Sequence, residues 1–440
     1  MNEKLFHSVA INLQRCRGCI HCIRHCPTEA MRVRNGKALI LSHRCIDCGE
    51  CIRVCPYHAP FAFTQTLESI ASLENIIVIF PPEFYAQFPT SYTLGQIKKG
   101  VQRTFSAKEV WDTTIAIYFL QQALEQYIST TSNLPLISTY CPAVVELIQV
   151  KFPTLIPHLS PFRPPFEIMG EIVKKLWKKS HPEESINLVY LAPCPAQVTN
   201  IKEPLDGRES VFSSVLGIDN VFINIKRNIT DEKEESYVYS PGLLWGGLGG
   251  ESSFLPEESA ISVGGMDEVV KVLEDLERNK FQDIKFLELR ACREGCIGGV
   301  LNPEDKYVAK KRLMYHIKTT KEDKELLKKL DNLISISDML LNKAILPRPI
   351  WKLDEDMGKA LKKMEEMREI LKILPGLDCG SCGSPTCSAL AEDIVRGNAQ
   401  IYDCIFVLKE KLREMAKEME EISRRSVSII PKRKEERDEE

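Results

Sequence analysis

Sixteen cysteines, all at spacings typical of metal ligands, constrain this 440-residue chain more than any other feature. Two runs near the N-terminus repeat the pattern C-x2-C-x2-C-x3-C-P. A third group, near the C-terminus, reads C-G-S-C-G-S-P-T-C with a fourth cysteine downstream, and four more cysteines are dispersed between these groups. Thiolates are soft ligands that suit iron–sulfur clusters or zinc. The sequence therefore predicts an iron–sulfur electron carrier or redox enzyme.

Composition narrows the class of protein further. Hydrophobic residues make up 44% of the chain, which is enough to build the cores of two or three domains. The net charge of −3 gives no reason to expect binding to nucleic acid or to an anionic membrane surface. Met1–Leu13 has no apolar signal run, and no stretch approaches the roughly 20 apolar residues that span a bilayer. Metal-type cysteine spacing in a long chain favours the reducing cytoplasm.

The two N-terminal cysteine runs resemble the bacterial two-cluster ferredoxin signature. The first run is Cys16, Cys19, Cys22 and Cys26, and the second is Cys45, Cys48, Cys51 and Cys55. In that signature the fourth cysteine of each run ligates the other [4Fe–4S] cluster. The predicted ligand sets are therefore Cys16, Cys19, Cys22 and Cys55 for one cluster, and Cys45, Cys48, Cys51 and Cys26 for the other. A hairpin is expected over Met31–Leu41, with a turn at Asn35-Gly36. A pair of zinc sites is the alternative interpretation.

From about Thr64 the pattern changes to short apolar runs that alternate with helical stretches. The apolar runs that predict buried strands are Ile76–Phe80, Leu134–Ile137, Leu188–Leu191 and Ile284–Leu289. Helices are expected over Ala107–Ile128 and Met266–Asn279. Alternating strands and helices indicate an α/β domain with a parallel sheet.

The four dispersed cysteines follow three of these predicted strands directly. They are Cys141, Cys194, Cys292 and Cys296, in segments that contain proline or glycine. Ligands of open α/β sheets bind outside the carboxyl ends of the strands, so the four thiols are expected to meet at one place. The alternative is buried structural cysteine, a common residue of protein cores.

These strand-end segments resemble the three cluster-binding motifs of [FeFe]-hydrogenases, which usually read T-S-C-C-P, M-P-C-x-x-K and E-x-M-x-C-x-x-G-C-x-x-G-G. Here they are Ser138–Pro142, Ala192–Gln197 and Glu288–Gly299, and the segments Leu159–Pro161 and Trp245–Gly250 also resemble the family. The resemblance covers about residues 1–345. It implies that Cys141, Cys194, Cys292 and Cys296 hold the [4Fe–4S] part of an H-cluster. Cys296 would also bridge to a two-iron subcluster with CO, cyanide and azadithiolate ligands, where the family reduces protons to H2 reversibly.

The chain departs from those motifs at positions that matter for chemistry. The family's proton-relaying cysteine is replaced by Tyr140, whose side chain is larger and has an ordinary pKa near 10 against about 8.5 for cysteine. The lysine that holds a cyanide is matched by Gln197, which can donate a hydrogen bond but carries no charge. Two methionines become Ala192 and Arg290. Arg290 is expected either to supply positive charge near the cluster or to pair with Glu288.

The family's proton path also continues through a serine and two glutamates. The serine falls on Ser160 and one glutamate on Glu125, but the other falls on Gln122, which cannot carry a proton as a carboxylate does. We therefore expect a substitute path through Glu251, which follows Gly249-Gly250, and Tyr140. The alternative is that Glu251 is a solvated loop residue.

The C-terminal cysteines form a separate group after a proline-containing linker and an amphipathic helix over Arg348–Leu374. They are Cys379, Cys382, Cys387 and Cys404, and they resemble a small four-cysteine [4Fe–4S] domain found in electron-transport complex subunits and corrinoid iron–sulfur proteins. A zinc site is the alternative. The next helix places Ile405, Leu408, Leu412, Met415, Met419 and Ile422 three and four residues apart, the spacing of a heptad seam. Dimerisation through this helix and packing onto its own domain are both open, and Lys432–Glu440 is predicted to be a disordered tail.

Together these patterns predict an α/β protein with a ferredoxin-like module, a central H-cluster domain and a small helical iron–sulfur domain. The expected boundaries are 1–63, 64–347, 348–406 and, for the last helix and charged tail, 407–440. The resemblance implies a slow, sensory [FeFe]-hydrogenase that exchanges electrons with ferredoxin or another redox partner and acts on a signalling protein. A conventional catalytic hydrogenase and a non-catalytic iron–sulfur scaffold of the same fold are the alternatives.

Overall fold

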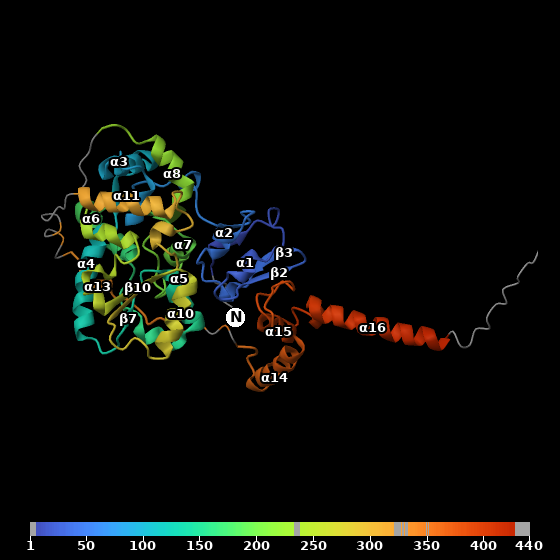
Figure 1. The fold of residues 1–440 in the computed structure, drawn as a ribbon. Coiled ribbons are helices and arrows are strands. Elements are labelled where there is room, and N and C mark those ends of the chain that lie inside the picture. The colour runs from blue at the N-terminus through green and yellow to red at the C-terminus, as the bar shows by residue number, and fades with distance from the viewer. Residues whose placement is uncertain are drawn as a thin grey trace, which may run out of the picture. The chain divides into compact units, whose positions relative to one another are not determined.

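The computed structural model describes residues 6–232, 238–320, 327, 330, 333–348, 350 and 352–426 (Figure 1). The chain divides into two compact units. The first comprises Met1–Arg17, His25–Ala30 and Ile40–Ile350, and the second comprises Gly18–Arg24, Met31–Leu39 and Trp351–Glu440. The first N-terminal cysteine run therefore contributes to both units, and the second run lies in the first unit. The tail predicted over Lys432–Glu440 lies outside the described residues.

The first unit is built on a parallel sheet with the strand order β6-β5-β8-β9. The strands are β5 (Ile76–Phe80), β6 (Glu109–Asp112), β8 (Asn187–Ala192) and β9 (Ser214–Gly217). Every residue of β5 is buried, as expected for a central strand covered on both faces. Helices α4 (Thr114–Thr130) and α6 (Pro165–Ser180) share one hydrophobic core with this sheet, and α3 (Leu94–Phe105) and α8 (Ile218–Arg227) share the other. The parallel α/β prediction is confirmed.

A second parallel sheet in this unit has the order β10-β11-β7. Its strands are β7 (Leu136–Ile137), β10 (Ala260–Gly264) and β11 (Phe286–Arg290). They share a core with α5 (Pro142–Lys151) and α10 (Met266–Glu277), the second of which matches the helix expected there. The central part of the chain also contains helices α7 (Pro195–Lys202), α9 (Ser240–Leu243), α11 (Lys306–Thr319) and α13 (Ile336–Met339).

The helix predicted over Ala107–Ile128 is wrong in its first part. Val110 and Trp111 lie in strand β6, where they pair with β5, and the helix begins only at Thr114. The Asp112 side chain ends the strand, because its Oδ1 accepts a hydrogen bond from the Thr114 backbone N–H at 3.0 Å. Pairing with a neighbouring strand overrides the local helical pattern here.

The N-terminal region contains short elements around the cysteine runs. Strand β1 (Val9–Ile11) pairs antiparallel with β4 (Pro60–Ala62), and α2 (Glu50–Val54) follows the second run's first two cysteines. In the second unit, α1 (His21–Arg24) precedes a hairpin of β2 (Met31–Arg34) and β3 (Lys37–Ile40). Asn35 and Gly36 both have positive φ angles of 51° and 70°, which confirms the expected turn.

The C-terminal part of the second unit is helical, as expected. Helix α14 (Met357–Ile373) packs against α15 (Cys387–Val395), and α16 (Ile405–Ser426) follows Cys404. The heptad-seam side chains of α16 are 40–70% exposed, so no described residue of this chain covers the seam. Among the described residues, helices that combine enough length and apolarity for a membrane span are absent.

Candidate metal centre and active site

Three strands of the first unit end in the dispersed cysteines. Cys141 follows β7 and is the N-cap of α5, and Cys194 follows β8 and is the N-cap of α7. In both helices proline takes the first helical position, where its missing N–H costs nothing. Cys292 and Cys296 lie in the loop that leaves β11. The strands therefore deliver four thiols to one end of the two sheets, as the sequence predicts.

These four thiols lie close enough to influence one another electrostatically. Burial raises the pKa of Cys194 and of Cys296 well above the ordinary value, and neighbouring cysteines raise both further. Burial likewise raises the pKa of Cys292 to about 11, although the Arg53 guanidinium opposes that shift. Deprotonating such a group of thiols is unfavourable without a cation. A metal cluster supplies that cation, and four thiolates are the ligand set of a [4Fe–4S] cluster.

The loop that carries Cys292 and Cys296 is fixed by close backbone contacts. A Cβ atom at Gly295, whose φ is +79°, would lie 2.6 Å from the backbone carbon of Gly247. A Cβ atom at Gly299 would lie 2.4 Å from the Pro193 carbonyl oxygen. Only glycine allows these approaches. The loop is therefore held between the turn that carries Cys194 and the Trp245–Gly250 segment.

Tyr140, which precedes Cys141, is buried and 3% exposed. Its ring meets Trp245 edge-on at 5.8 Å between centroids, and the Arg290 guanidinium lies over its face at 3.8 Å. Burial raises the pKa of Tyr140 well above 10, and nearby Glu83 raises it further. A phenol in this setting holds its proton at neutral pH, so Tyr140 is a poor proton donor.

Arg290 is the centre of a buried ion network beside the cysteines. Its Nη2 donates to Glu251 Oε2 at 2.9 Å, and its Nε donates to Glu288 Oε1 at 3.3 Å. Its Nη1 lies 4.0 Å from the Cys296 Sγ. The two expectations for Arg290 are thus both met: the residue pairs with Glu288 and also places positive charge beside a predicted ligand.

Glu251 is 2% exposed, so it is not a solvated loop residue. Ser138 Oγ donates to its carboxylate, at 2.6 Å from Oε2 and 2.8 Å from Oε1. Burial raises the pKa of Glu251 to about 7, and the positive charge of Arg290 limits the rise. The carboxyl group therefore exists in both protonation states near neutral pH, as a general acid–base residue requires.

A second buried carboxyl group, Glu83, was not found by sequence reasoning. It follows Pro81-Pro82 directly after β5, the same strand-end position that the cysteines occupy, and this was the signal available. Both of its carboxylate oxygens lack a hydrogen-bond partner among the described residues. Burial raises the pKa of Glu83 to about 8. When ionised, it would raise the pKa of Tyr140, Cys194 and Cys296, so it lies near these residues.

The remaining predicted site residues are placed differently. Gln197 is buried, and its Oε1 accepts a hydrogen bond from the Tyr190 hydroxyl at 2.9 Å. The Nε2 of the same amide is a donor. Ser160 is buried, and its backbone N–H donates to Ile137 in β7. Glu125 is exposed on α4 and accepts a hydrogen bond from Gln121. Glu125 is therefore not brought to the cysteines.

The second N-terminal cysteine run contacts this site within the first unit. Arg53 of α2 donates from Nη1 to the Gly298 carbonyl at 3.1 Å and from Nη2 to the Cys292 Sγ at 3.4 Å. Burial raises the pKa of Cys48 well above the ordinary value, and Cys26 contributes, which agrees with the predicted crossed ligand set. Of the other predicted set, Cys16 and Cys55 belong to the first unit and Cys19 and Cys22 to the second.

The C-terminal cysteines gather in a small core of the second unit. Cys404 is buried there, and Cys382 and Cys387 pack against it. Asp378 Oδ1 accepts a hydrogen bond from the Cys387 backbone N–H at 2.6 Å, which ties this ligand to the turn that begins the motif. Together with Cys379, these residues offer four sulfur donors, a set that fits an iron–sulfur cluster.

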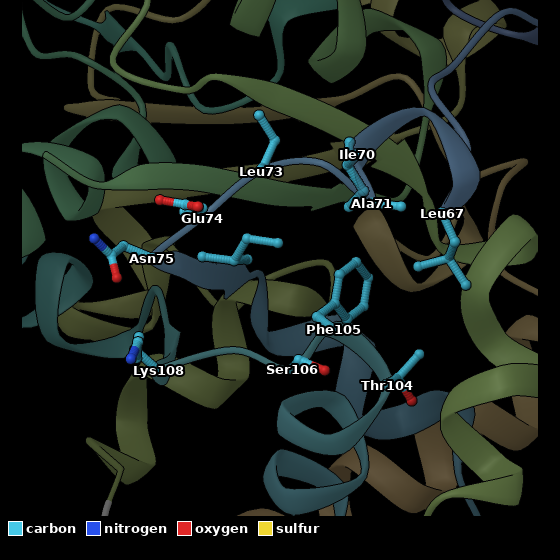
Figure 2. Close-up of a pocket in the computed structure, with 11 residues that line it drawn as sticks. Leu67, Ile70, Ala71, Leu73, Glu74, Asn75, Thr104, Phe105, Ser106 and Lys108 are labelled. Carbon is cyan, nitrogen blue, oxygen red and sulfur yellow. The ribbon is translucent and has the colours of Figure 1, made fainter.

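A cavity elsewhere in the first unit carries no comparable chemistry. This cavity has a volume of about 550 Å³. Its lining residues, drawn in Figure 2, include no cysteine, and only Glu74 and Lys108 among them are charged. We assign it no role in the site.

The residues around Cys296 fit the H-cluster that the resemblance to [FeFe]-hydrogenases implies. The four sulfur donors match a [4Fe–4S] cluster. Glu83, with its raised pKa, is protonated at neutral pH and so presents an O–H donor without a partner in the described structure. Such a donor and the Arg290 guanidinium suit cyanide ligands of a two-iron unit next to Cys296.

Comparison with known proteins agrees with this geometry. Residues 74–233 match the family described as iron only hydrogenase large subunit, C-terminal domain. Residues 8–56 match a 4Fe-4S dicluster domain, and residues 374–406 match an Fe-S cluster family. The solved [FeFe]-hydrogenase HydA(ΔEFG) superposes with a TM-score of 0.51 and 15% sequence identity, over 64% of this chain and 98% of its own. At that identity, the match shows the fold.

Curated relatives match only short parts of the chain. An uncharacterized protein of Methanocaldococcus jannaschii is 38% identical over 60 residues, which are 14% of this chain and 27% of that protein. A component of the ion-translocating oxidoreductase complex of Rhodobacter capsulatus is 53% identical over 38 residues, which are 9% of this chain and 20% of that protein. The chain thus spans about a quarter or less of these relatives. The match of residues 74–233, the flanking iron–sulfur matches, the hydrogenase fold and the converging cysteines together support an iron-only hydrogenase large-subunit-like protein with additional iron–sulfur domains.

Proposed function

We propose that this chain catalyses the reversible reaction H2 ⇌ 2H⁺ + 2e⁻ at a low rate and serves as a sensor of H2 or of redox state. The convergence of Cys141, Cys194, Cys292 and Cys296 at three strand ends carries the proposal. The contact from Arg53 to Cys292 supports electron exchange with the second N-terminal cluster. Sixteen metal-type cysteines require a reducing compartment, so we propose a cytoplasmic location.

The four cysteines would hold the H-cluster, which when bound supplies the conversion between H2, protons and electrons. The protein supplies the surroundings of the reaction. Arg290 and Glu83 would orient polar ligands beside Cys296, and Gln197 would add a neutral donor. Because Gln197 is uncharged, its hydrogen bond is roughly half as strong as that of a charged donor.

Glu251 is the residue best placed to move protons. Its pKa of about 7 lets it accept and release a proton near neutral pH. Arg290 does not release protons, so it holds the Glu251 carboxylate in place and leaves proton transfer to that group. Tyr140, with its raised pKa, is a weak relay, and this is the reason to expect a rate suited to sensing rather than to bulk H2 production.

The first experiment is infrared spectroscopy of protein matured with the two-iron cofactor, recorded under H2 and then under inert gas. CO and cyanide bands that shift reversibly with H2 are the expected result. Missing bands in protein with full iron–sulfur content would overturn the proposal.

A second experiment tests the proton route with a matched pair of variants. Glu251→Gln should reduce H2 turnover by about two orders of magnitude, the usual contribution of general acid–base catalysis. Glu257→Gln, the same change at an exposed position, should leave turnover near the parent value. Equal effects of the two variants would contradict the role of Glu251.

One observation favours a second candidate, an iron–sulfur scaffold without the two-iron unit. The Tyr140 ring and the Arg290 guanidinium stack at 3.8 Å beside Cys296, where the family usually has smaller uncharged residues. In that case the infrared bands would be absent while the iron–sulfur content remained complete. Turnover as fast as in enzymes with a relay cysteine would instead favour a conventional catalytic hydrogenase.

The partners of the chain are also proposals. A ferredoxin or another small redox protein would exchange electrons at the N-terminal module, and a signalling protein would receive the output. The exposed heptad seam of α16 suits a second copy of the same helix, because a 3–4 spacing of apolar side chains matches itself in a coiled coil.

A further inference from the structure

Within the second unit, the loop of the C-terminal cysteines is bonded to the hairpin of the N-terminal module. The Val33 backbone N–H donates to the Gly383 carbonyl at 2.7 Å. Arg34 Nη1 donates to the Cys382 carbonyl at 3.2 Å. The approach is so close that a Cβ atom at Gly383 would lie 2.0 Å from the Val33 carbonyl oxygen. The loop is therefore in backbone contact with strand β2.

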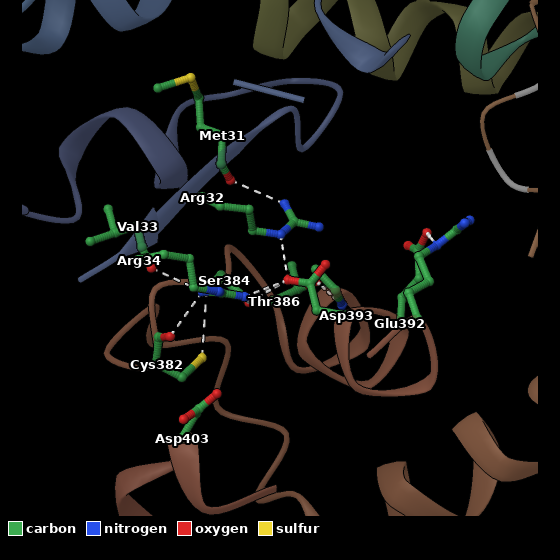
Figure 3. A network of polar contacts seen from close by, with 12 residues as sticks. Met31, Arg32, Val33, Arg34, Cys382, Ser384, Thr386, Glu392, Asp393 and Asp403 are labelled. Atoms are coloured by element: carbon green, nitrogen blue, oxygen red, sulfur yellow. Dashed lines mark hydrogen bonds and ion pairs between the residues drawn. The ribbon is translucent and has the colours of Figure 1, made fainter. Parts of the chain in front are cut away.

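A buried ion network fixes the same contact (Figure 3). Asp393 Oδ2 accepts hydrogen bonds from Arg32 Nε and Arg34 Nη2, each at 2.6 Å, and from Ser384 Oγ at 2.9 Å. The side chains of Arg32 and Asp393 are 2% and 7% exposed. Two guanidinium groups share the Asp393 carboxylate, and Arg34 places a positive charge beside Cys382. We call these four residues, Arg32, Arg34, Ser384 and Asp393, the clamp.

The two cysteine loops also touch each other directly. A Cβ atom at Gly380, which lies between Cys379 and Cys382, would be 3.3 Å from the Ile23 Cδ1 and 3.7 Å from the Ile20 Cγ2. Ile20 and Ile23 flank Cys22 in the first N-terminal run. Side chains next to the predicted ligands of one cluster thus meet backbone next to the predicted ligands of the other.

We propose that the clamp makes the C-terminal cluster the direct redox partner of the N-terminal cluster that Cys19 and Cys22 help to hold. One electron leaves the reduced N-terminal cluster and reduces the C-terminal one, with no other reactant. The positive charge of Arg34 beside Cys382 favours the more negative, reduced state of the C-terminal cluster, which suits that cluster to accept the electron. The inference rests on the iron–sulfur modules and not on H2 chemistry.

The test uses the full chain with its [4Fe–4S] clusters reconstituted and without the two-iron cofactor. A redox titration followed by electron paramagnetic resonance measures the midpoint potential of the C-terminal cluster. The fully reduced sample also shows whether neighbouring clusters couple magnetically. The C-terminal signal is assigned with the ligand variant Cys404→Ser, which should remove both that signal and its coupling.

Arg34→Gln should shift the C-terminal midpoint potential to a more negative value and weaken the coupling. The control Lys37→Gln removes one positive charge from an exposed position of the same hairpin and should change neither. Arg34→Lys keeps the charge but loses the forked geometry, so it should retain most of the potential while weakening the coupling.

Two results would overturn the proposal. One is a reduced parent protein in which the C-terminal cluster shows no magnetic coupling to an N-terminal cluster. The other is a potential that stays unchanged in Arg34→Gln. If Arg34→Gln fails to fold, judged by circular dichroism, the potential and coupling of Arg34→Lys decide the matter. Loss of H2 activity alone bears only on the proposed function, because none of these readouts depends on it.

Discussion

The buried network beside Cys296 and the clamp beside Cys382 use the same residue types with opposite charge balance. In the first, one arginine, Arg290, pairs with the two carboxylates of Glu251 and Glu288. In the second, two arginines share the single carboxylate of Asp393. Burial, with a smaller contribution from the neighbouring Glu288 carboxylate, raises the pKa of Glu251 to about 7 and leaves a group that can exchange protons. An excess of arginine, which does not release its proton, leaves a fixed positive charge. By this comparison, the network beside Cys296 suits proton exchange, whereas the clamp beside Cys382 suits electron transfer.

Removing the only arginine of the first network should have the largest effect. Arg290→Met leaves Glu251 and Glu288 buried without their cation, and breaking a buried pair in this way typically costs about 3–5 kcal/mol. Urea unfolding measures the loss. Tryptophan fluorescence follows the transition, and Trp245, which packs on Tyr140, contributes to that signal.

The control for this variant is Arg293→Met, which removes an arginine that is 65% exposed and pairs with Asp267 at the surface. It should change the free energy of unfolding little. An Arg290→Met protein as stable as the parent would show that the two carboxyl groups are protonated together without the arginine, and the assigned charge balance would be wrong.

Removing the carboxylate of the clamp should have the next largest effect. Asp393→Asn leaves Arg32 and Arg34 without their shared anion, and the expected cost is about 2–3 kcal/mol, since the Arg34 side chain is 22% exposed and partly solvated. Hydrogen exchange of β2 and α15 should accelerate. Glu369→Gln, which removes an exposed helix carboxylate that pairs with Lys372, is the control and should leave exchange unchanged. Unchanged exchange in Asp393→Asn would contradict the clamp.

The stability of the protein should depend on pH through Glu251, which belongs to the network beside Cys296. The pKa of Glu251 is higher in the folded state than its ordinary value of about 4.3. Its contribution is therefore fully present below pH 4.3 and is lost as pH rises through about 7. The groups that face it are Arg290, Glu288 and Ser138. Between pH 5.5 and 8 the parent should lose about 1–2 kcal/mol more than Glu251→Gln, measured by urea unfolding. Parallel curves for the two proteins would exclude the raised pKa.

The sequence predicts the cysteine ligands and the strands that deliver them, because both leave short-range patterns. The motif spacing identifies Cys292 and Cys296 without any tertiary information. Buried strands such as β5 are continuous apolar runs, so their position is also readable. The Glu251 hypothesis succeeds in placing that residue at the site, because a glycine-rich turn precedes it. Glu125, chosen only by alignment with a family motif, is instead exposed.

What the sequence could not show are contacts between distant segments. Asp393 lies 361 residues from Arg32, and no local pattern connects them. Glu83 has the residue type of an ordinary surface group, and only the packing around η3 (Pro82–Gln87) makes it buried and unpartnered. Strand β6 likewise depends on pairing with β5. Charge balance in both networks is therefore a property of the tertiary structure.

The smallest expected effects come from a matched pair of serines, one in each network. Both are fully buried: Ser138 Oγ donates to Glu251 and accepts from the Tyr140 backbone N–H, whereas Ser384 Oγ donates to Asp393 and accepts from Arg34. Replacing either by alanine should cost about 1–2 kcal/mol, the usual cost of leaving buried hydrogen-bonding groups without a partner. Urea unfolding measures both losses. The two variants should differ in their effects on the pH profile of stability and on the midpoint potential. Ser138→Ala removes a hydrogen bond to the charged form of Glu251, so its pKa should rise further and the pH at which stability falls should move upward. Ser384→Ala removes no charge from the clamp, so the midpoint potential of the C-terminal cluster should stay close to the parent value. If the two variants instead shifted the pH profile equally, the excess carboxylate beside Cys296 would not be what tunes the proton site.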